Sequence, residues 1–289
     1  MQNKLAKNKI VLGGAQFGSP YSISRKYNNI DEKMKFKLLN FAYTNGINCI
    51  DLAQSYGNSE KLIGNYLKQS NQKWRIITKI NSNKKNIDFC LEESYEKLNV
   101  KPHTVLAHDV EKYLDPQYCD FLHALKNKGV KKIGVSIYNF LDINKILTMI
   151  KPDVIQFPLN IIDNKIYKSK ILMDLKKENI ELHARSVWLQ GLFFLSKDKI
   201  REKFEDIFPV VEELILLSNS YGISLPDLSL KWVDSLEEID KIVIGVEDIK
   251  QLKINLKTLE TKVDPLVYDK ALLINYDNEE ILNPSKWKK

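Results

Sequence analysis

Short apolar runs rich in Ile and Val alternate along the chain with longer segments in which apolar residues recur at intervals of three and four. The short runs are typical of buried strands, and the longer segments are typical of amphipathic helices. Their alternation indicates repeated strand–helix units around a parallel sheet. The predicted strands are Ile10–Gly14, Ile47–Leu52, Arg75–Lys79, Thr104–His108, Lys132–Ser136, Val154–Pro158, Glu181–Ser186 and Lys241–Val246.

Eight such strands are the number that closes a (β/α)8 barrel, an α/β fold of about 250 residues. Gly46 and Gly129 directly follow two of the helical segments, where Gly accepts the left-handed conformation that ends many helices. The long stretch after the seventh strand predicts an additional loop or helix over Lys197–Phe208 before the helix Val210–Tyr221. The other predicted helices are Glu32–Asn45, Ser59–Gln69, Ile87–Leu98, Gln117–Lys128, Leu141–Ile150 and Ser169–Glu178.

The chain has 289 residues and neither a low-complexity linker nor a break in composition, so residues 1–289 are predicted to form one domain. A doubly wound open sheet fits the same alternation. That fold usually carries a G-x-G-x-x-G turn after its first strand, and the run GGAQFG over residues 13–18 lacks this spacing.

Composition narrows the possible roles. With 44% hydrophobic and 28% charged residues the chain is expected to be soluble and globular. The apolar stretch Trp188–Leu195 is too short to span a bilayer, which takes about 20 residues, and residues 1–9 do not resemble a signal peptide. Three cysteines without C-x-x-C spacing predict neither disulfides nor a metal site, and they fit a cytoplasmic location. The net charge of +7 is spread along the chain, so nucleic-acid binding is not expected.

Four polar residues stand at or just beyond the ends of consecutive predicted strands: Asp51, Tyr56, Lys79 and His108. Taken singly, each has an ordinary structural interpretation as a turn, rim, solvated or core residue. Taken together they matter more, because the reactive side chains of such barrels come from the carboxyl ends of strands.

These four residue types suit carbonyl reduction, in which a hydride reaches carbon and a proton must reach oxygen. Tyr56 is a plausible proton donor. A neighbouring Lys79 ammonium would lower the pKa of the phenol towards working pH, and Asp51 would hold that ammonium in place. His108 would orient the carbonyl oxygen by donating a hydrogen bond.

The sequence here resembles the aldo-keto reductase family over most of the chain, from about Lys9 to Asn255. The matching stretches are NCIDLAQSYGNSE over residues 48–60, ITK over 77–79, LAH over 106–108 and IGVS over 133–136. The D-x4-Y-G-x-S-E run is the most specific of them. The resemblance implies a catalytic tetrad of Asp51, Tyr56, Lys79 and His108, a small-molecule carbonyl substrate, and NADPH or NADH as the cofactor.

The resemblance also implies a set of cofactor-binding residues. Ser136 and Gln156 match residues that bind the nicotinamide carboxamide, although the Asn usually beside Ser136 is Ile137 here. Arg185 stands where the family commonly has an aromatic residue stacked on the nicotinamide, and a planar guanidinium can also stack on a ring. The implied cofactor-binding residues are Gly14, Ser136, Gln156, Arg185, Ser186, Leu189, Gly191, Gly245, Glu247, Gln251 and Asn255.

The segment after the last strand resembles the part of the family that wraps the adenosine end of the cofactor. Glu247, Asp248 and Gln251 lie there with Lys250 and Lys253 as the only cations. A carboxylate repels a 2′-phosphate and accepts a hydrogen bond from a 2′-hydroxyl, so NADH use and NADPH use both stay open.

Several aromatic residues fall in segments expected at the barrel mouth, where they would pack loops over the barrel or line a substrate pocket. They are Phe17, Tyr21, Trp188, Phe193 and Phe194. Near the C-terminal end, Trp287 is either an anchor for the tail or part of a disordered remnant.

Two other functions fit the sequence. A catalytically weak, nucleotide-binding regulatory barrel is possible because Ile137 and Arg185 depart from the family pattern. A Schiff-base lyase acting through Lys79 is also possible, although it would need an uncharged Lys and Asp51 is expected nearby. No feature of the sequence sets an oligomeric state.

Overall fold

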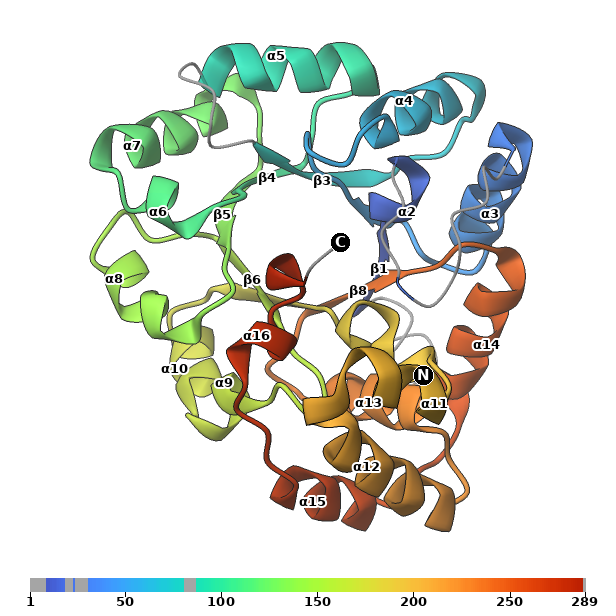
Figure 1. Ribbon diagram of the computed structural model, residues 1–289. Helices are drawn as coiled ribbons and strands as arrows, with labels where there is room; N and C mark the ends of the chain where they lie inside the picture. The colour runs from blue at the N-terminus through green and yellow to red at the C-terminus, as the bar shows by residue number, and fades with distance from the viewer. Residues whose placement is uncertain (1–8, 19–22, 24–30, 81–86, 288–289) are drawn as a thin grey trace.

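Eight parallel strands close into a barrel in sequence order, with β8 paired to β1, as the view in Figure 1 shows. The computed structural model describes residues 9–18, 23, 31–80 and 87–287. The predicted (β/α)8 barrel is confirmed, and the strand ends agree with the prediction to within two residues. The strands are β1 (Ile10–Gly13), β2 (Cys49–Asp51), β3 (Arg75–Ile80), β4 (Thr104–Ala107), β5 (Lys132–Ser136), β6 (Val154–Pro158), β7 (Glu181–Arg185) and β8 (Lys241–Gly245).

Helices form an outer ring around this barrel (Figure 1). Within the described ranges no helix is both long and apolar enough to cross a bilayer. The α-helices are α2 (Ala15–Gly18), α3 (Glu32–Thr44), α4 (Ser59–Gln69), α5 (Ile87–Leu98), α6 (Val110–Tyr113), α7 (Pro116–Ala124), α8 (Ile143–Leu147), α9 (Lys165–Lys168), α10 (Ile171–Lys177), α11 (Lys197–Lys203), α12 (Phe208–Ser220), α13 (Leu225–Ser235), α14 (Ile249–Glu260), α15 (Leu266–Leu273) and α16 (Glu279–Leu282). The short 3₁₀ helices are η1 (Leu125–Lys128), η2 (Phe140–Asp142), η3 (Leu189–Phe194), η4 (Glu205–Ile207) and η5 (Pro284–Lys286).

Several predicted helices are shorter or broken in the structure. The helix predicted over residues 169–178 starts only at Ile171, because Lys170 has a left-handed backbone with φ of 62°. The segment predicted over 141–150 is a 3₁₀ turn followed by α8, which ends at Leu147. The additional helical region before α12 is present as α11 and η4.

The barrel interior contains a small apolar cluster of its own. Val11, Cys49, Ile77, Leu106 and Val154 are buried there, and Val243 packs against them. Successive side chains of a strand point to opposite faces, so the residue two positions further along each strand also faces the interior, nearer the carboxyl ends. That geometry sets which residues surround the mouth of the barrel.

The C-terminal segment lies over the mouth on the side of β6 (Figure 1). Leu282 of α16 shares a small cavity with Tyr138 and Pro158 at the ends of β5 and β6. The Trp287 ring lies 4.7 Å from the Phe204 ring, and its indole N–H donates a hydrogen bond to the Ile281 carbonyl. These contacts support the interpretation of Trp287 as an anchor for the C-terminal tail.

Candidate active site

A ring of residues surrounds the mouth of the barrel. On most strands the ring residue lies two positions beyond the residue of the interior apolar cluster, and β5 and β7 contribute the equivalent position. Most of the predicted catalytic and nicotinamide-end residues lie on this ring, together with two glycines that are paired across β1 and β8. The ring consists of Gly13, Asp51, Lys79, His108, Ser136, Gln156, Arg185 and Gly245.

Asp51 and Lys79 form a buried ion pair at the centre of this ring. Lys79 Nζ lies 2.5 Å from Asp51 Oδ2, and the two side chains are 1% and 4% exposed. The ammonium also donates to the Leu52 carbonyl at 3.0 Å and lies 3.5 Å from the Tyr56 hydroxyl. Gln156 Nε2 donates to the other carboxylate oxygen of Asp51 at 3.0 Å. The pair therefore joins strands β2, β3 and β6 and places a cation beside the phenol.

Tyr56 stands on the loop between β2 and α4, which two glycines hold against the loop after β1. A Cβ atom at Gly18 would lie 1.8 Å from the Tyr56 carbonyl oxygen, and one at Gly57 would lie 2.6 Å from the Gly18 carbonyl oxygen. Gly57 also has φ of 56°, a conformation that favours Gly. On the far side of the loop, buried Glu60 accepts a 2.7 Å hydrogen bond from Thr78 and ties α4 to β3. The D-x4-Y-G-x-S-E motif over residues 51–60 thus holds the phenol of Tyr56 in place.

The electrostatic environment of Tyr56 differs from the expectation that Lys79 lowers its pKa. Burial, followed by the Asp51 carboxylate, raises the pKa of the phenol above its ordinary value, while Arg185 acts in the opposite direction. Asp51, which is paired with Lys79, thus adds its own negative charge to the effect of burial at the phenol. The hydroxyl is therefore held protonated, as a proton donor must be before reaction.

His108 lies just after β4, with its ring 6.0 Å from the Tyr56 ring in an edge-to-face arrangement. Burial and the nearby Lys79 and Arg185 charges lower the pKa of the imidazole to about 4, so the ring is neutral at pH 7. Nδ1 lies 3.3 Å from the Ser55 hydroxyl. A neutral ring that accepts a hydrogen bond from Ser55 at Nδ1 carries its own proton on Nε2, where it is available as a donor.

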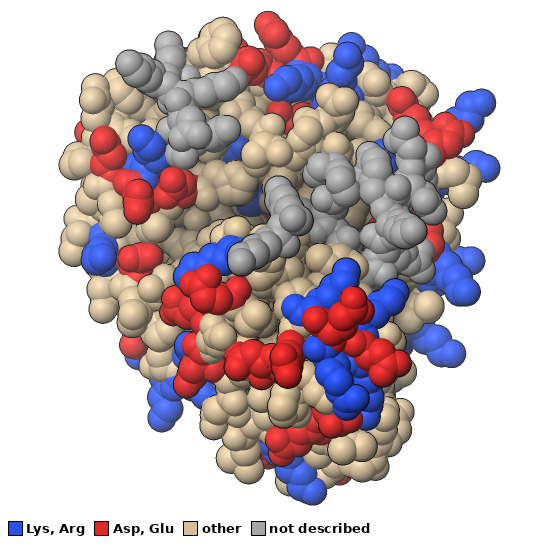
Figure 2. All heavy atoms as spheres, in the orientation of Figure 1, with Lys and Arg blue, Asp and Glu red and all other residues tan. Residues whose placement is uncertain are grey.

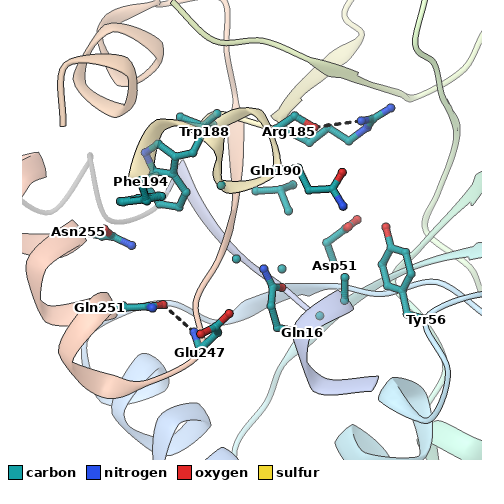
Figure 3. A pocket seen from close by; sticks show the side chains of 18 of the residues that line it. Gln16, Asp51, Tyr56, Arg185, Trp188, Gln190, Phe194, Glu247, Gln251 and Asn255 are labelled. Atoms are coloured by element: carbon teal, nitrogen blue, oxygen red, sulfur yellow. Dashed lines mark hydrogen bonds between the residues drawn. The ribbon is translucent and has the colours of Figure 1, made fainter. Parts of the chain in front are cut away.

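A pocket of about 390 Å³ opens from Asp51 and Tyr56 towards the seam between β1 and β8. In Figure 3, Asp51 and Tyr56 lie on one side of it, and Gln251 and Asn255 project from α14 on the other. Glycines at the seam leave the space open. The lining residues are Gly13, Gly14, Ala15, Gln16, Asp51, Tyr56, Arg185, Ser186, Val187, Trp188, Gln190, Gly191, Phe194, Val243, Gly245, Glu247, Gln251, Ile254 and Asn255.

The structure brings most of the predicted cofactor-binding residues to this pocket. Those lining it are Gly14, Arg185, Ser186, Gly191, Gly245, Glu247, Gln251 and Asn255. The other three predicted residues do not line it. Leu189 is fully buried in the core, Ser136 is buried at the end of β5, and Gln156 is buried with its amide directed to Asp51.

The loop after β7 has a strained backbone where it borders the pocket. Ser186, Leu189 and Gln190 have φ values of 57°, 45° and 52°, and Gly191 has φ of 96°. Only Gly adopts this region readily, and such strain at non-glycine residues often accompanies ligand-binding loops. Ser186 and Gln190, which line the pocket, therefore depend on the surrounding fold to hold this conformation.

Seven residues that line the pocket were not among the predicted site residues: Gly13, Ala15, Gln16, Val187, Gln190, Val243 and Ile254. Gln16 follows the carboxyl end of β1, the same signal that singled out Asp51, and that signal could have found it. Gln190 and Ile254 carry no chemical signal of their own.

Among the rim aromatics, Phe17, Trp188 and Phe193 are buried and pack the loops. Trp188 also lines the pocket. Phe194 is 51% exposed and lines the pocket, edge-to-face with Trp188 at 5.3 Å. Tyr21 lies outside the described residues.

Comparisons with known proteins agree with this geometry. The model of the Aldo/keto reductase family matches residues 9–271. The chain belongs to this family. A D-arabinose 1-dehydrogenase from Saccharomyces cerevisiae is 24% identical over 284 aligned positions that cover 87% of this chain and 82% of that protein.

Solved structures of aldo-keto reductases share the fold. The glycerol dehydrogenase from Gluconobacter oxydans has a TM-score of 0.70 at 22% identity and covers 91% of this chain and 90% of its own. An aldo-keto reductase from Klebsiella pneumoniae in complex with NADPH has a TM-score of 0.70 at 16% identity, with 91% and 89% covered. This aldo-keto reductase is an NAD(P)H-dependent oxidoreductase.

The residues at the mouth fit a nicotinamide cofactor. Gln156 Oε1 is buried and has no hydrogen-bond partner among the described residues. A buried acceptor of this kind costs free energy unless a donor reaches it, and the amide N–H of a carboxamide is such a donor.

Proposed function

We propose that this aldo-keto reductase reduces a small polar aldehyde or ketone to an alcohol, with Tyr56 as the proton donor. The observation that supports this most strongly is the assembly of Tyr56 and the buried Asp51–Lys79 pair beside an open, glycine-lined pocket. A Schiff-base role for Lys79 would need an uncharged amine, whereas its ammonium is paired with Asp51 at 2.5 Å.

Each side chain has a separate task in this proposal. Tyr56 carries its proton at the hydroxyl and delivers it to the carbonyl oxygen. Lys79 stands 3.5 Å from that hydroxyl and stabilises the negative charge left on the phenol, while Asp51 holds the ammonium in position. Neutral His108 donates from Nε2 to the same carbonyl oxygen and orients it. When bound, the reduced nicotinamide supplies the hydride that reaches the carbonyl carbon.

The cofactor would lie along the pocket between the ring of polar residues and α14. Ser136 and Gln156 would hold the carboxamide at the nicotinamide end. The loop of Ser186 and Gly191 would follow the pyrophosphate, and Gln251 and Asn255 would hold the adenosine end.

We also propose that NADH is preferred over NADPH. Glu247 lines the adenosine end of the pocket, and a carboxylate there repels a 2′-phosphate. Two cations lie in the same segment. Lys250 is exposed, and Lys253 lies over the Phe41 ring at 5.4 Å. At least a tenfold difference in affinity between the two nucleotides is expected.

The relatives suggest a hydroxylated substrate. A D-arabinose 1-dehydrogenase and a glycerol dehydrogenase are named among them, and both names refer to oxidation of a hydroxylated compound. We extend this to the present chain as a small polar carbonyl compound or the corresponding alcohol. The same groups serve both directions because proton transfer through Tyr56 is reversible.

Titration of the purified protein with NADH and with NADPH, followed by fluorescence, tests the cofactor proposal directly. Loss of NADH absorbance with a panel of hydroxylated aldehydes and ketones then tests the reaction. Tight binding with turnover supports the proposal. Tight binding without turnover on any aldehyde or alcohol would favour a nucleotide-binding regulatory barrel, and absence of binding would contradict both.

We further propose that residues 1–289 form one domain that acts on small molecules in the cytoplasm. Cys49, Cys90 and Cys119 are free thiols, which suits a reducing compartment. On the face shown in Figure 2, Lys and Arg are interspersed with Asp and Glu, without the continuous basic stripe that nucleic-acid binding favours.

A further inference from the structure

Arg185 ends β7 at the edge of the pocket, and three contacts fix its guanidinium. Nη2 donates to the Ile137 carbonyl at 3.0 Å, and Nη1 donates to the Ser186 hydroxyl at 3.2 Å. The guanidinium carbon lies 4.2 Å from the centre of the Tyr138 ring. The planar group thus lies over a protein ring from the segment just after β5 and is held in one orientation before any ligand arrives.

The positive charge of Arg185 is unbalanced. Its two hydrogen bonds use two of the five guanidinium N–H groups, and both partners are neutral. Across the described chain, no Asp or Glu side chain lies within ion-pair distance of it. Asp163 interacts with Arg185 through its charge, but burial raises the pKa of Asp163 to about 7, so this carboxyl is partly protonated at neutral pH. A partly buried cation without a counter-charge is costly.

The guanidinium acts on the same space as the catalytic groups. Arg185, Asp51 and Tyr56 line one pocket, and Figure 3 shows the Arg185 side chain on the same side as Tyr56. Its charge lowers the pKa of His108 and counteracts the rise in the pKa of Tyr56, so its field reaches both groups. A molecule whose carbonyl oxygen lies at Tyr56 can therefore place another group at Arg185.

We propose that Arg185, held by Tyr138 and Ile137, is an anion subsite that selects carbonyl substrates carrying a carboxylate or a phosphate. A guanidinium presents paired N–H donors that match the oxygens of either group. This proposal rests on the proposed carbonyl reduction and specifies its substrate class. Arg185 then serves the substrate, in place of the ring-stacking role that its sequence position implies.

Two matched pairs of substrates test the subsite. Succinic semialdehyde is compared with butanal for the carboxylate, and glyceraldehyde 3-phosphate with glyceraldehyde for the phosphate. For each pair, kcat/KM with NADH is measured for wild type, Arg185→Met and Arg185→Lys. Arg201→Met is the matched control, because Arg201 also stacks on a ring, that of Phe208 at 4.4 Å, but does not line the pocket.

Wild type should favour the anionic member of at least one pair by tenfold or more, equivalent to about 1.4 kcal/mol. The pair that shows the preference identifies whether the anion is a carboxylate or a phosphate. Arg185→Met should reduce the ratio to near one through a higher KM, Arg185→Lys should retain part of it, and Arg201→Met should leave it unchanged. The Kd for NADH should stay within twofold in all variants. An unchanged ratio in Arg185→Met, or a tenfold weaker Kd for NADH with the ratio retained, would overturn the subsite.

Failure of the reaction itself is distinguishable from failure of the subsite. If wild type turns over none of the four aldehydes, binding of the same compounds is measured by calorimetry without a reduced cofactor. Tighter binding of an anionic member that disappears in Arg185→Met would support the subsite and contradict only the carbonyl reduction. Equal binding of both members by wild type would contradict the subsite.

Discussion

Replacing Lys79 with Met would leave the Asp51 carboxylate buried without its counter-charge. In the wild type, Lys79 Nζ pairs with Asp51 Oδ2 at 2.5 Å and donates a second hydrogen bond to the Leu52 carbonyl. Both charged side chains are almost fully buried. Met has nearly the same length and leaves little empty space, so the loss is mainly electrostatic. Breaking a buried pair from one side costs about 3–5 kcal/mol. That is a large part of the roughly 5–15 kcal/mol that stabilises a typical folded protein.

The double variant Asp51→Asn/Lys79→Met separates the charge from the packing. An Asn at position 51 can keep the hydrogen bond from Gln156 without needing a cation. The double variant should therefore recover at least half of the stability that Lys79→Met loses. Urea unfolding followed by Trp fluorescence at pH 7.5 gives the free energy of unfolding for each protein. Equal stability of wild type and Lys79→Met, or a double variant no more stable than the single one, would refute the reasoning.

Four other predictions follow from the site. Tyr56→Phe should lower kcat at least a hundredfold and leave the Kd for NADH within twofold, because only the proton donor is removed; an unchanged reduction rate in stopped-flow absorbance would count against this role. The pKa of His108 is about 4 in the folded chain against about 6.5 unfolded, so the folded state binds fewer protons between these values and its stability falls as the pH is lowered through them. Wild type should lose about 3 kcal/mol between pH 7 and pH 4 that His108→Asn does not lose, and parallel urea-unfolding profiles for the two proteins would rule this out. Glu247→Arg should shift the ratio of the Kd values for NADPH and NADH at least tenfold towards NADPH in fluorescence titrations; a constant ratio would show that Glu247 does not approach the ribose. Gly18→Ala should displace the loop of Tyr56, since its Cβ would meet the Tyr56 carbonyl oxygen at 1.8 Å, and kcat should fall at least tenfold; full activity would show that the loop tolerates the shift.

The barrel could be predicted from the sequence because most strands are short, largely apolar runs that alternate with helical segments. Asp51, Lys79 and His108 were predictable for a related reason: they are polar residues at the ends of such runs, where a barrel builds its site. The helices were less predictable. The break at Lys170 depends on a left-handed residue that no pattern marks, and α8 ends early although its apolar period continues.

The remaining features of the site depend on contacts between distant segments. The pKa of Tyr56 rises because folding buries the phenol and brings the Asp51 carboxylate near it, and the residue types alone reveal neither effect. Arg185 points to Tyr138, a contact between β7 and the segment after β5 that sequence spacing does not reveal. Ile254 lines the pocket because α14 packs beside the β1–β8 seam, so its place follows from closure of the barrel.

The seam between β1 and β8 joins opposite ends of the chain, with Gly13 directly beside Gly245. All four proposed catalytic residues are present once the chain has been synthesised as far as His108, yet the pocket they face needs Glu247, Gln251 and Asn255 from the far end. Nucleotide affinity is therefore a property of the closed ring, and a growing or truncated chain that lacks β8 has no complete binding groove. In refolding experiments, the recovery of NADH fluorescence would report the moment at which the last strand joins the first.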